Sequence, residues 1–311
     1  MGTMEEIPSL LSVKLLLKPV FDGSSGCQSL LIQLTFPKLD IIPSKDILRA
    51  IFEPNNGNSS VYDPRKPWAS DSAGFFPIQR TRDDSGERYT AGRDVVGTLV
   101  IKYLISLSEF ESISSFHKQE AGLILVGTWF LPRWVSGNAT TQLVVEWDLQ
   151  DTPAGNRTVC SFGEGPGPMF KTGAIETLLD CVYMFGAIKS DPPPISSKEA
   201  VPHASGTYWL AGLPPNLDCV TSYTSNIFPQ MSEFFRDTQG SYRTFLRRVP
   251  QGLYGCTYHA SSIINFGPET EYTHDYDLVR LLNHHMVASW VGLDGEADGT
   301  QNEWFGKGEQ C

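Results

Sequence analysis

The chain has 311 residues, of which 24 are basic and 35 acidic, so its formal net charge is −11. This acidic balance argues against a nucleic-acid surface, which needs clustered Lys and Arg. Hydrophobic residues at 41% and charged residues at 19% exclude a disordered chain, and the length suits two domains. The 28 glycines and 21 prolines favour a strand-rich, turn-rich fold.

The first half is expected to consist mainly of strands, because short β-branched or aromatic runs alternate there with Gly, Pro, Asn and Asp. The expected strands are residues 13–17, 30–36, 98–107, 123–131 and 143–149. Residues 53–94 are rich in Asn, Asp, Arg, Pro and Gly, which is typical of a long surface excursion. We therefore expect an antiparallel β-sandwich-like domain over residues 1–165.

The second half has a different pattern. The Gly- and Pro-rich segment 163–168 is expected to mark the joint between two domains, and residues 190–204 a loop or linker. Helical spacing of apolar residues predicts helices over 214–235 and 275–290. Strands are expected over 242–249 and 261–266. Residues 166–311 are thus predicted to form an α+β domain.

The N-terminus has neither the basic start nor the apolar core of a signal peptide, and no apolar run is long enough to cross a membrane. The six cysteines include no C-x-x-C pair, so we expect reduced thiols in a cytoplasmic protein, with the sequons at Asn58, Asn138 and Asn156 arising by chance. No phosphate loop or dinucleotide fingerprint is present, and no cofactor is expected.

The helix expected at 275–290 carries an unusual motif. Residues 284–290 read H-H-M-V-A-S-W, and residues 304–308 read W-F-G-K-G. The chain here resembles the glycyl aminopeptidase family of gluzincin metallopeptidases, especially its fungal members, which present H-E-M-V-H-N-W and then W-[FY]-x-E-G. Eighteen residues separate Ala288 from Lys307, as in such families. Other stretches that are similar to the family are residues 146–149, 151–153, 162–168, 208–215 and 228–235.

The resemblance implies a partial thermolysin-like domain whose zinc site is degenerate. In the family, two His at i and i+4 on one helix face bind zinc, a Glu between them is the general base, and a later Glu is the third ligand. His284 matches the first ligand, whereas His285 stands at the position of the base. Ala288 replaces the second His, and Lys307 replaces the ligand Glu with a cation that repels a metal. We therefore expect no bound metal and no zinc peptidase activity.

One hypothesis is an enzyme adapted to metal-independent chemistry. His284 or His285 would act as acid or base near neutrality, Lys307 would stabilise an anion, and Glu303 is a further candidate catalytic residue. Such a site suits an isomerisation, cyclisation or elimination on a small molecule in specialised metabolism. Two simpler interpretations remain open: His285 is a hydrogen-bonded core histidine, and Lys307 only pairs with Glu303, one helical turn earlier.

A second hypothesis is a non-catalytic pseudopeptidase that binds or sequesters a peptide or small molecule. Trp290, Trp304 and Phe305 would line its groove. Members of the family continue with a helical lobe beyond the last ligand position. The resemblance therefore also admits a truncated fragment of an aminopeptidase, and a partner chain or a second copy that covers the missing lobe.

Overall fold

The computed structural model describes residues 12–21, 27–36, 48–50, 68–83, 86–107, 117–119, 122–133, 140–194, 203–210, 212–237 and 240–291. The chain divides into two compact units, each assembled from separate stretches. Unit 1 comprises Met1–Glu109, Thr128–Asp151 and Pro166–Leu179. Unit 2 comprises Phe110–Gly127, Thr152–Gly165 and Asp180–Cys311. The boundary predicted after residue 165 is one of the points at which the chain crosses between units, but there it passes from unit 2 back into unit 1.

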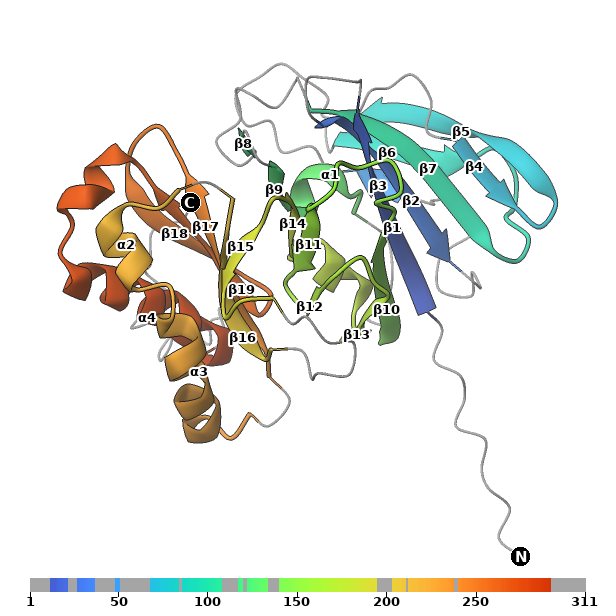
Figure 1. Ribbon diagram of the computed structural model, residues 1–311. Helices are drawn as coiled ribbons and strands as arrows, with labels where there is room; N and C mark the ends of the chain where they lie inside the picture. Colours follow the sequence, from blue (N-terminus) through green and yellow to red (C-terminus); the bar gives the residue numbers. More distant parts are fainter. Residues whose placement is uncertain are drawn as a thin grey trace, which may run out of the picture. The chain divides into compact units, whose positions relative to one another are not determined.

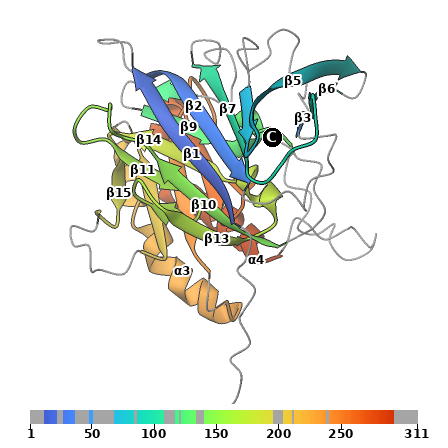
Figure 2. The ribbon, with the colours of Figure 1, turned by 90° about the vertical axis from the view of Figure 1, so that its right-hand side faces the viewer.

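Unit 1 is built on a nine-stranded sheet in the order β13-β10-β1-β2-β7-β4-β5-β6-β3. Its strands are β1 (Ser12–Phe21), β2 (Cys27–Phe36), β3 (Leu48–Ala50), β4 (Trp68–Asp71), β5 (Gly74–Asp83), β6 (Gly86–Ala91), β7 (Leu99–Ser106), β10 (Thr141–Trp147) and β13 (Met169–Gly173). Figure 2 shows β1 between β2, which is antiparallel to it, and β10, which is parallel. Val13, Leu15 and Leu17 are buried while the residues between them are half-buried, so one face of β1 forms core.

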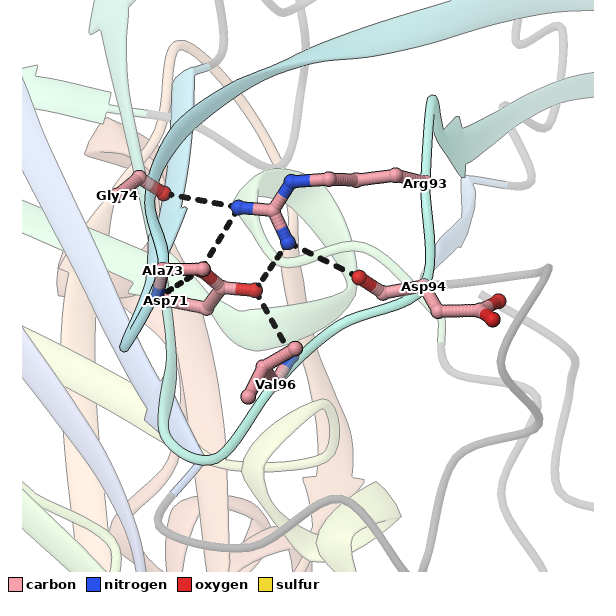
Figure 3. Close-up of polar contacts among 6 residues, drawn as sticks. All are labelled: Asp71, Ala73, Gly74, Arg93, Asp94 and Val96. Carbon is pink, nitrogen blue, oxygen red and sulfur yellow. Dashed lines mark hydrogen bonds and ion pairs between the residues drawn. The ribbon is translucent and has the colours of Figure 1, made fainter.

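The surface excursion expected over residues 53–94 is wrong in part, because β4, β5 and β6 lie within it. The polar composition of these three strands lacks the pattern from which strands are predicted. A half-buried ion pair fixes the turn between β4 and β5: the Asp71 carboxylate accepts hydrogen bonds from both Arg93 Nη atoms, at 2.5 and 2.8 Å (Figure 3). The same carboxylate accepts backbone N–H bonds from Ala73 and Val96, each 2.8 Å long. Tertiary contacts here replace the hydrophobic alternation that usually marks a strand.

Unit 2 contains two five-stranded sheets. The first has the order β12-β11-β14-β9-β8 and consists of β8 (His117–Gln119), β9 (Gly122–Val126), β11 (Arg157–Cys160), β12 (Gly163–Glu164) and β14 (Val182–Gly186). The second has the order β15-β16-β17-β19-β18 and consists of β15 (Lys189–Asp191), β16 (Ser205–Trp209), β17 (Tyr242–Arg248), β18 (Leu253–Tyr258) and β19 (Ser261–Phe266). In this mixed sheet β16, β17 and β19 are parallel, and β18 runs antiparallel at the end.

Three helices lie on one face of the mixed sheet, α2 (Pro215–Cys219), α3 (Tyr223–Phe234) and α4 (Asp275–Val291) (Figure 1). Leu246, Ile264 and Phe266 of the sheet pack with Leu278 and Leu282 of α4 in one hydrophobic cluster. This face of the mixed sheet is called the helix face below. The α+β fold class is confirmed, and no described helix has the length and hydropathy needed to cross a membrane.

Two predicted elements differ in detail. The single helix expected over 214–235 is two helices, because α2 ends at Cys219 and α3 begins at Tyr223. The strand expected over 123–131 stops at Val126, where the short helix α1 (Gly127–Phe130) follows. Strands 242–249 and 261–266 and helix 275–290 are confirmed to within two residues. The remaining short helices are the 3₁₀ turns η2 (Ile175–Leu178) and η3 (Pro268–Tyr272).

Candidate functional site

Helix α4 presents its two histidines to different surroundings. His284 is exposed, whereas His285 is buried with 8% of its surface exposed. Successive residues of a helix differ by about 100° around its axis, so neighbours in sequence face different directions. The predicted apolar stripe is confirmed: Leu278, Leu282 and Met286 are buried on the same side as His285. The motif thus places one imidazole in the core and one at the surface.

The buried imidazole connects α4 to strand β18. Nδ1 of His285 lies 2.8 Å from Oγ1 of Thr257. The opposite edge of the ring lies against Gly255, where an added Cβ would be only 2.1 Å from Nε2. Gly255 and Thr257 are two residues apart in β18 and therefore share one face of the strand. His285 fills the space between the helix and the strand and leaves no gap there for a larger side chain at residue 255.

Thr257 is the last of a row of hydroxyl side chains that crosses the helix face. The sheet register places Thr207, Thr244, Ser262 and Thr257 side by side on β16, β17, β19 and β18. The helices bond to this row, since Thr224 Oγ1 lies 3.0 Å from Thr244 Oγ1. The contact between His285 and Thr257 is the corresponding bond from α4. A polar seam therefore fixes the position of the imidazole.

Burial decides the charge of His285. Desolvation, and to a smaller extent the neighbouring His284, lowers the pKa of His285 to about 4. The two rings lie 5.0 Å apart at 85°. The imidazole is consequently neutral near pH 7. This geometry supports the interpretation of His285 as a hydrogen-bonded core histidine.

Trp290 belongs to the packing between α3 and α4. Its ring stacks on Phe228 at 5.5 Å and on Phe235 at 5.0 Å, and its indole N–H donates to Asp237 Oδ2 at 2.9 Å. These contacts tie the C-terminal turn of α4 to the end of α3. The other predicted site residues, which are Glu303, Trp304, Phe305 and Lys307, lie outside the described part of the chain.

Thr257 and Gly255 are site residues that the sequence did not reveal. They precede His285 by about thirty positions, and only the sheet register and the packing of α4 bring them to it. Gly252 and Gly255 within a hydrophobic and aromatic run were an available signal, because a strand glycine often marks a close approach.

On the described part of α4, one exposed imidazole stands where the motif of the family has two zinc ligands. The i, i+4 pair on α4 consists of His284 and Ala288, and the methyl group of Ala288 supplies no lone pair. His285 has its Nδ1 committed to Thr257 and its Nε2 edge closed by Gly255. Among the residues that the structure describes, no three His, Cys, Asp or Glu side chains form a group that would hold a metal.

Among known proteins, the chain is similar to solved structures of low sequence identity. No protein-family model matches it, and no curated protein matches it. Solved structures do. The chain is similar to an aminopeptidase N family protein from Idiomarina loihiensis, with a TM-score of 0.60 and 12% identity over 89% of this chain. It is also similar to leukotriene A4 hydrolase from Saccharomyces cerevisiae, with a TM-score of 0.53 and 14% identity over 91% of this chain.

Over the part of each protein that it spans, the chain shares the fold of these two proteins. A mutant M1 zinc metallopeptidase from Deinococcus radiodurans, bound to a Tyr-Ser-Ala substrate, adds a TM-score of 0.50 at 15% identity over 91% of this chain. The chain spans 47% of the Idiomarina protein, 44% of the yeast hydrolase and 64% of the Deinococcus enzyme. The predicted thermolysin-like architecture is thereby confirmed at the level of fold.

Proposed function

We propose that this protein is a pseudopeptidase, a chain that keeps the aminopeptidase fold, lacks the zinc-dependent reaction, and binds peptides. The buried His285 carries this proposal. In an active site of this type the position holds a carboxylate that takes a proton from a metal-bound water. Here it holds a neutral imidazole that bonds to Thr257 and presses on Gly255. The resemblance to the glycyl aminopeptidases, including the fungal branch, is part of the same proposal.

The missing donor at Ala288 supports the loss of zinc. An intact site needs three protein ligands, and the described part of α4 offers the single exposed imidazole of His284. One imidazole in water binds zinc too weakly to hold it at cellular concentrations, because chelation supplies most of the affinity.

Peptide binding is supported by strand β18. Among the described strands it is the last of the mixed sheet. An extended peptide can add to the last strand of a sheet as a further strand. The residues of β18 are half-buried or exposed, which leaves the strand accessible. The bond between Thr257 and His285 holds this edge in place.

A second candidate is metal-independent acid–base chemistry on a small molecule in specialised metabolism. The exposed position of His284 favours it, since a surface imidazole can exchange protons with a ligand. In this case His284 would be the acid or base, with Lys307 and Glu303 as the partners predicted from the sequence. His285 would only position the helix.

Two measurements test the main proposal. Protein purified without chelators should contain far less than one zinc per chain by elemental analysis, and should leave aminoacyl-7-amido-4-methylcoumarin substrates intact. Labelled extended peptides should bind, as measured by fluorescence polarisation. A full equivalent of zinc with peptidase activity would overturn the proposal, as would the failure of every peptide to bind.

A His284→Ala variant distinguishes the second candidate function from peptide binding. If the chain converts a small molecule and this variant does not, the catalytic hypothesis replaces the binding one. Peptide binding by the variant should equal that of the wild type under the main proposal.

We also propose a cytoplasmic location, consistent with the exposed thiol of Cys219. Cell fractionation with thiol labelling tests it: a glycosylated or secreted product would contradict it.

A further inference from the structure

Apolar side chains gather near the turn of the hairpin that β4 and β5 form in unit 1. Phe75, the second residue of β5, is 78% exposed, and Trp68, the first residue of β4, is 38% exposed. Their rings meet edge to face with centroids 5.5 Å apart. Val96 is 53% exposed and lies beside the turn, because its carbonyl oxygen accepts a hydrogen bond from the Ser72 amide at 3.0 Å. Exposed aromatic and aliphatic side chains in one place indicate a contact surface.

A lysine stands beside these rings without an anionic partner. Lys102 of β7 lies opposite Trp68 in the sheet register, and its Nζ is 4.8 Å from the centroid of the indole ring. No ion pair joins Lys102 to a carboxylate of the described residues. The surface made by Phe75, Trp68, Val96 and Lys102 is called the hairpin tip below. It offers a cation next to apolar groups, which suits a partner that is apolar and negatively charged.

The order of these residues along the hairpin indicates the kind of partner. Phe75 lies opposite Ser70, next to the turn, whereas Trp68 and Lys102 lie one two-residue step farther from it. Such a step along a strand measures about 6.6 Å. Apolar side chains that enter a bilayer reach the boundary of the acyl chains, while the amphipathic side chains of Trp and Lys stay at the level of the headgroups. The hairpin tip presents its residues in this order.

The turn is held in place by the ion pair between Asp71 and Arg93 (Figure 3). The same guanidinium lies over the ring of Phe76, which is buried. Successive residues of a strand face opposite sides, so the burial of Phe76 directs Phe75 outward. The exposed side chain of Asp94 points away from Asp71 in Figure 3. A surface that is already held in one conformation loses less entropy on binding.

We propose that the hairpin tip is a peripheral contact with an anionic lipid bilayer. Phe75 and Val96 enter the boundary of the acyl chains, Trp68 lies among the headgroups, and Lys102 pairs with a lipid phosphate. A contact of this kind needs no segment that crosses the membrane, because the side chains enter only the interface. It is independent of the peptide binding proposed for β18.

Flotation of the full chain with vesicles tests this contact. The protein should bind vesicles of phosphatidylcholine and phosphatidylserine. Phe75→Ser should lower the partition coefficient by about 10-fold, since it removes most of the apolar area that enters the bilayer. Lys102→Gln should lower it by about 5-fold on these vesicles and leave binding to pure phosphatidylcholine unchanged. Phe170→Ser is the matched control, because Phe170 is 56% exposed on β13 at the other end of the described sheet and should not affect binding.

A fluorescence measurement tests the depth assigned to Trp68. The difference between the emission of the wild type and that of Trp68→Phe isolates this indole, and its emission should shift to the blue when vesicles are added. Failure of the wild type to float with vesicles, equal binding by Phe75→Ser, or unchanged emission of Trp68 would overturn the proposal. So would a Phe75→Ser variant that alters self-association in sedimentation velocity and leaves vesicle binding intact, since the hairpin tip would then be an interface between copies of the chain.

Discussion

Asp71 and Arg93 are 22 residues apart in sequence and form a two-pronged ion pair in which the carboxylate side chain is completely buried. The guanidinium also donates to the backbone oxygens of Gly74 and Asp94 (Figure 3). It lies over the ring of Phe76, 4.5 Å from the centroid. One side chain thus joins the turn between β4 and β5 to the segment that follows β6.

Asp71→Asn should therefore loosen this corner of unit 1. The substitution removes the charge on which both guanidinium bonds depend and should lower the melting temperature by on the order of 5 °C. Asp94→Asn is the control, because Asp94 is exposed and contributes only its backbone oxygen. Differential scanning calorimetry would measure both, and equal melting temperatures for the two variants would contradict the role given to the ion pair.

The contribution of the same ion pair to stability should depend on pH. The bonds from Arg93, followed by those of the Val96 and Ala73 amides, hold the pKa of Asp71 well below its usual value. A carboxyl group whose folded pKa is lowered contributes stability above its unfolded pKa, and that stability is lost as the pH falls below about 4. Urea unfolding at pH 5 and pH 3 should show a smaller loss in Asp71→Asn than in the wild type. An identical loss in both proteins would show that other groups dominate.

His285 should make the stability of the protein depend on pH in a higher range. Its pKa of about 4 lies below the value near 6.5 of an unfolded chain, so the unfolded state binds more protons between these limits. The free energy of unfolding should fall by on the order of 2–3 kcal/mol as the pH falls from about 6.5 to 4. His285→Leu should lack this decrease, and His284→Asn should keep most of it. A pH dependence that is unchanged in His285→Leu would refute the buried neutral state.

Gly255→Ala should destabilise the protein by about 2 kcal/mol, because the new Cβ meets the imidazole of His285. The double variant with His285→Ala removes the obstacle, so its loss of stability should be clearly smaller than the sum of the two single losses. Gly212→Ala provides the control, since a Cβ there meets nothing within 4 Å. Strict additivity of the Gly255 and His285 effects would show that the two groups do not touch.

Arg236 follows the end of α3 with a φ of 56°, a left-handed conformation that favours glycine. Its amide bonds to Glu233 and that of Asp237 bonds to Ser232, so the conformation closes the helix. Arg236→Gly should stabilise the protein by about 1 kcal/mol in urea unfolding. Arg236→Ala keeps the unfavourable φ and should give no comparable gain; a gain of the same size from alanine would attribute the effect to the lost side chain.

Local patterns predicted part of this fold and missed the rest for identifiable reasons. The alternation in β1 and the apolar stripe of α4 were sufficient, because each element buries one regular face. Strands β4 and β6 escaped, since they carry residues such as Asp71 and Thr90 and are held by hydrogen bonds and an ion pair rather than by apolar alternation. Strand β18 escaped because Gly255 weakens a strand signal.

The candidate site was likewise predicted only in part from the sequence. The motif around His284 and His285 was visible in the sequence because it lies within one helix. Its partner Thr257 became apparent only with the register of β18 and the packing of α4, which depend on contacts distant in sequence. The run Y-R-T-F-L-R-R of β17 gave a signal, since a charged residue on a buried strand requires an explanation. The partner of Arg247, which is Asn265, is brought to it only by the parallel pairing of β17 with β19.

The contact between the imidazole of His285 and Gly255 restricts which residues can occur together at these two positions. A side chain at residue 255 is tolerated only when residue 285 is small or turned away, and histidine at 285 is tolerated only when residue 255 is glycine. In a homologous chain that has histidine at position 285, we therefore expect glycine at position 255. Among homologous chains, these two positions should vary as a pair.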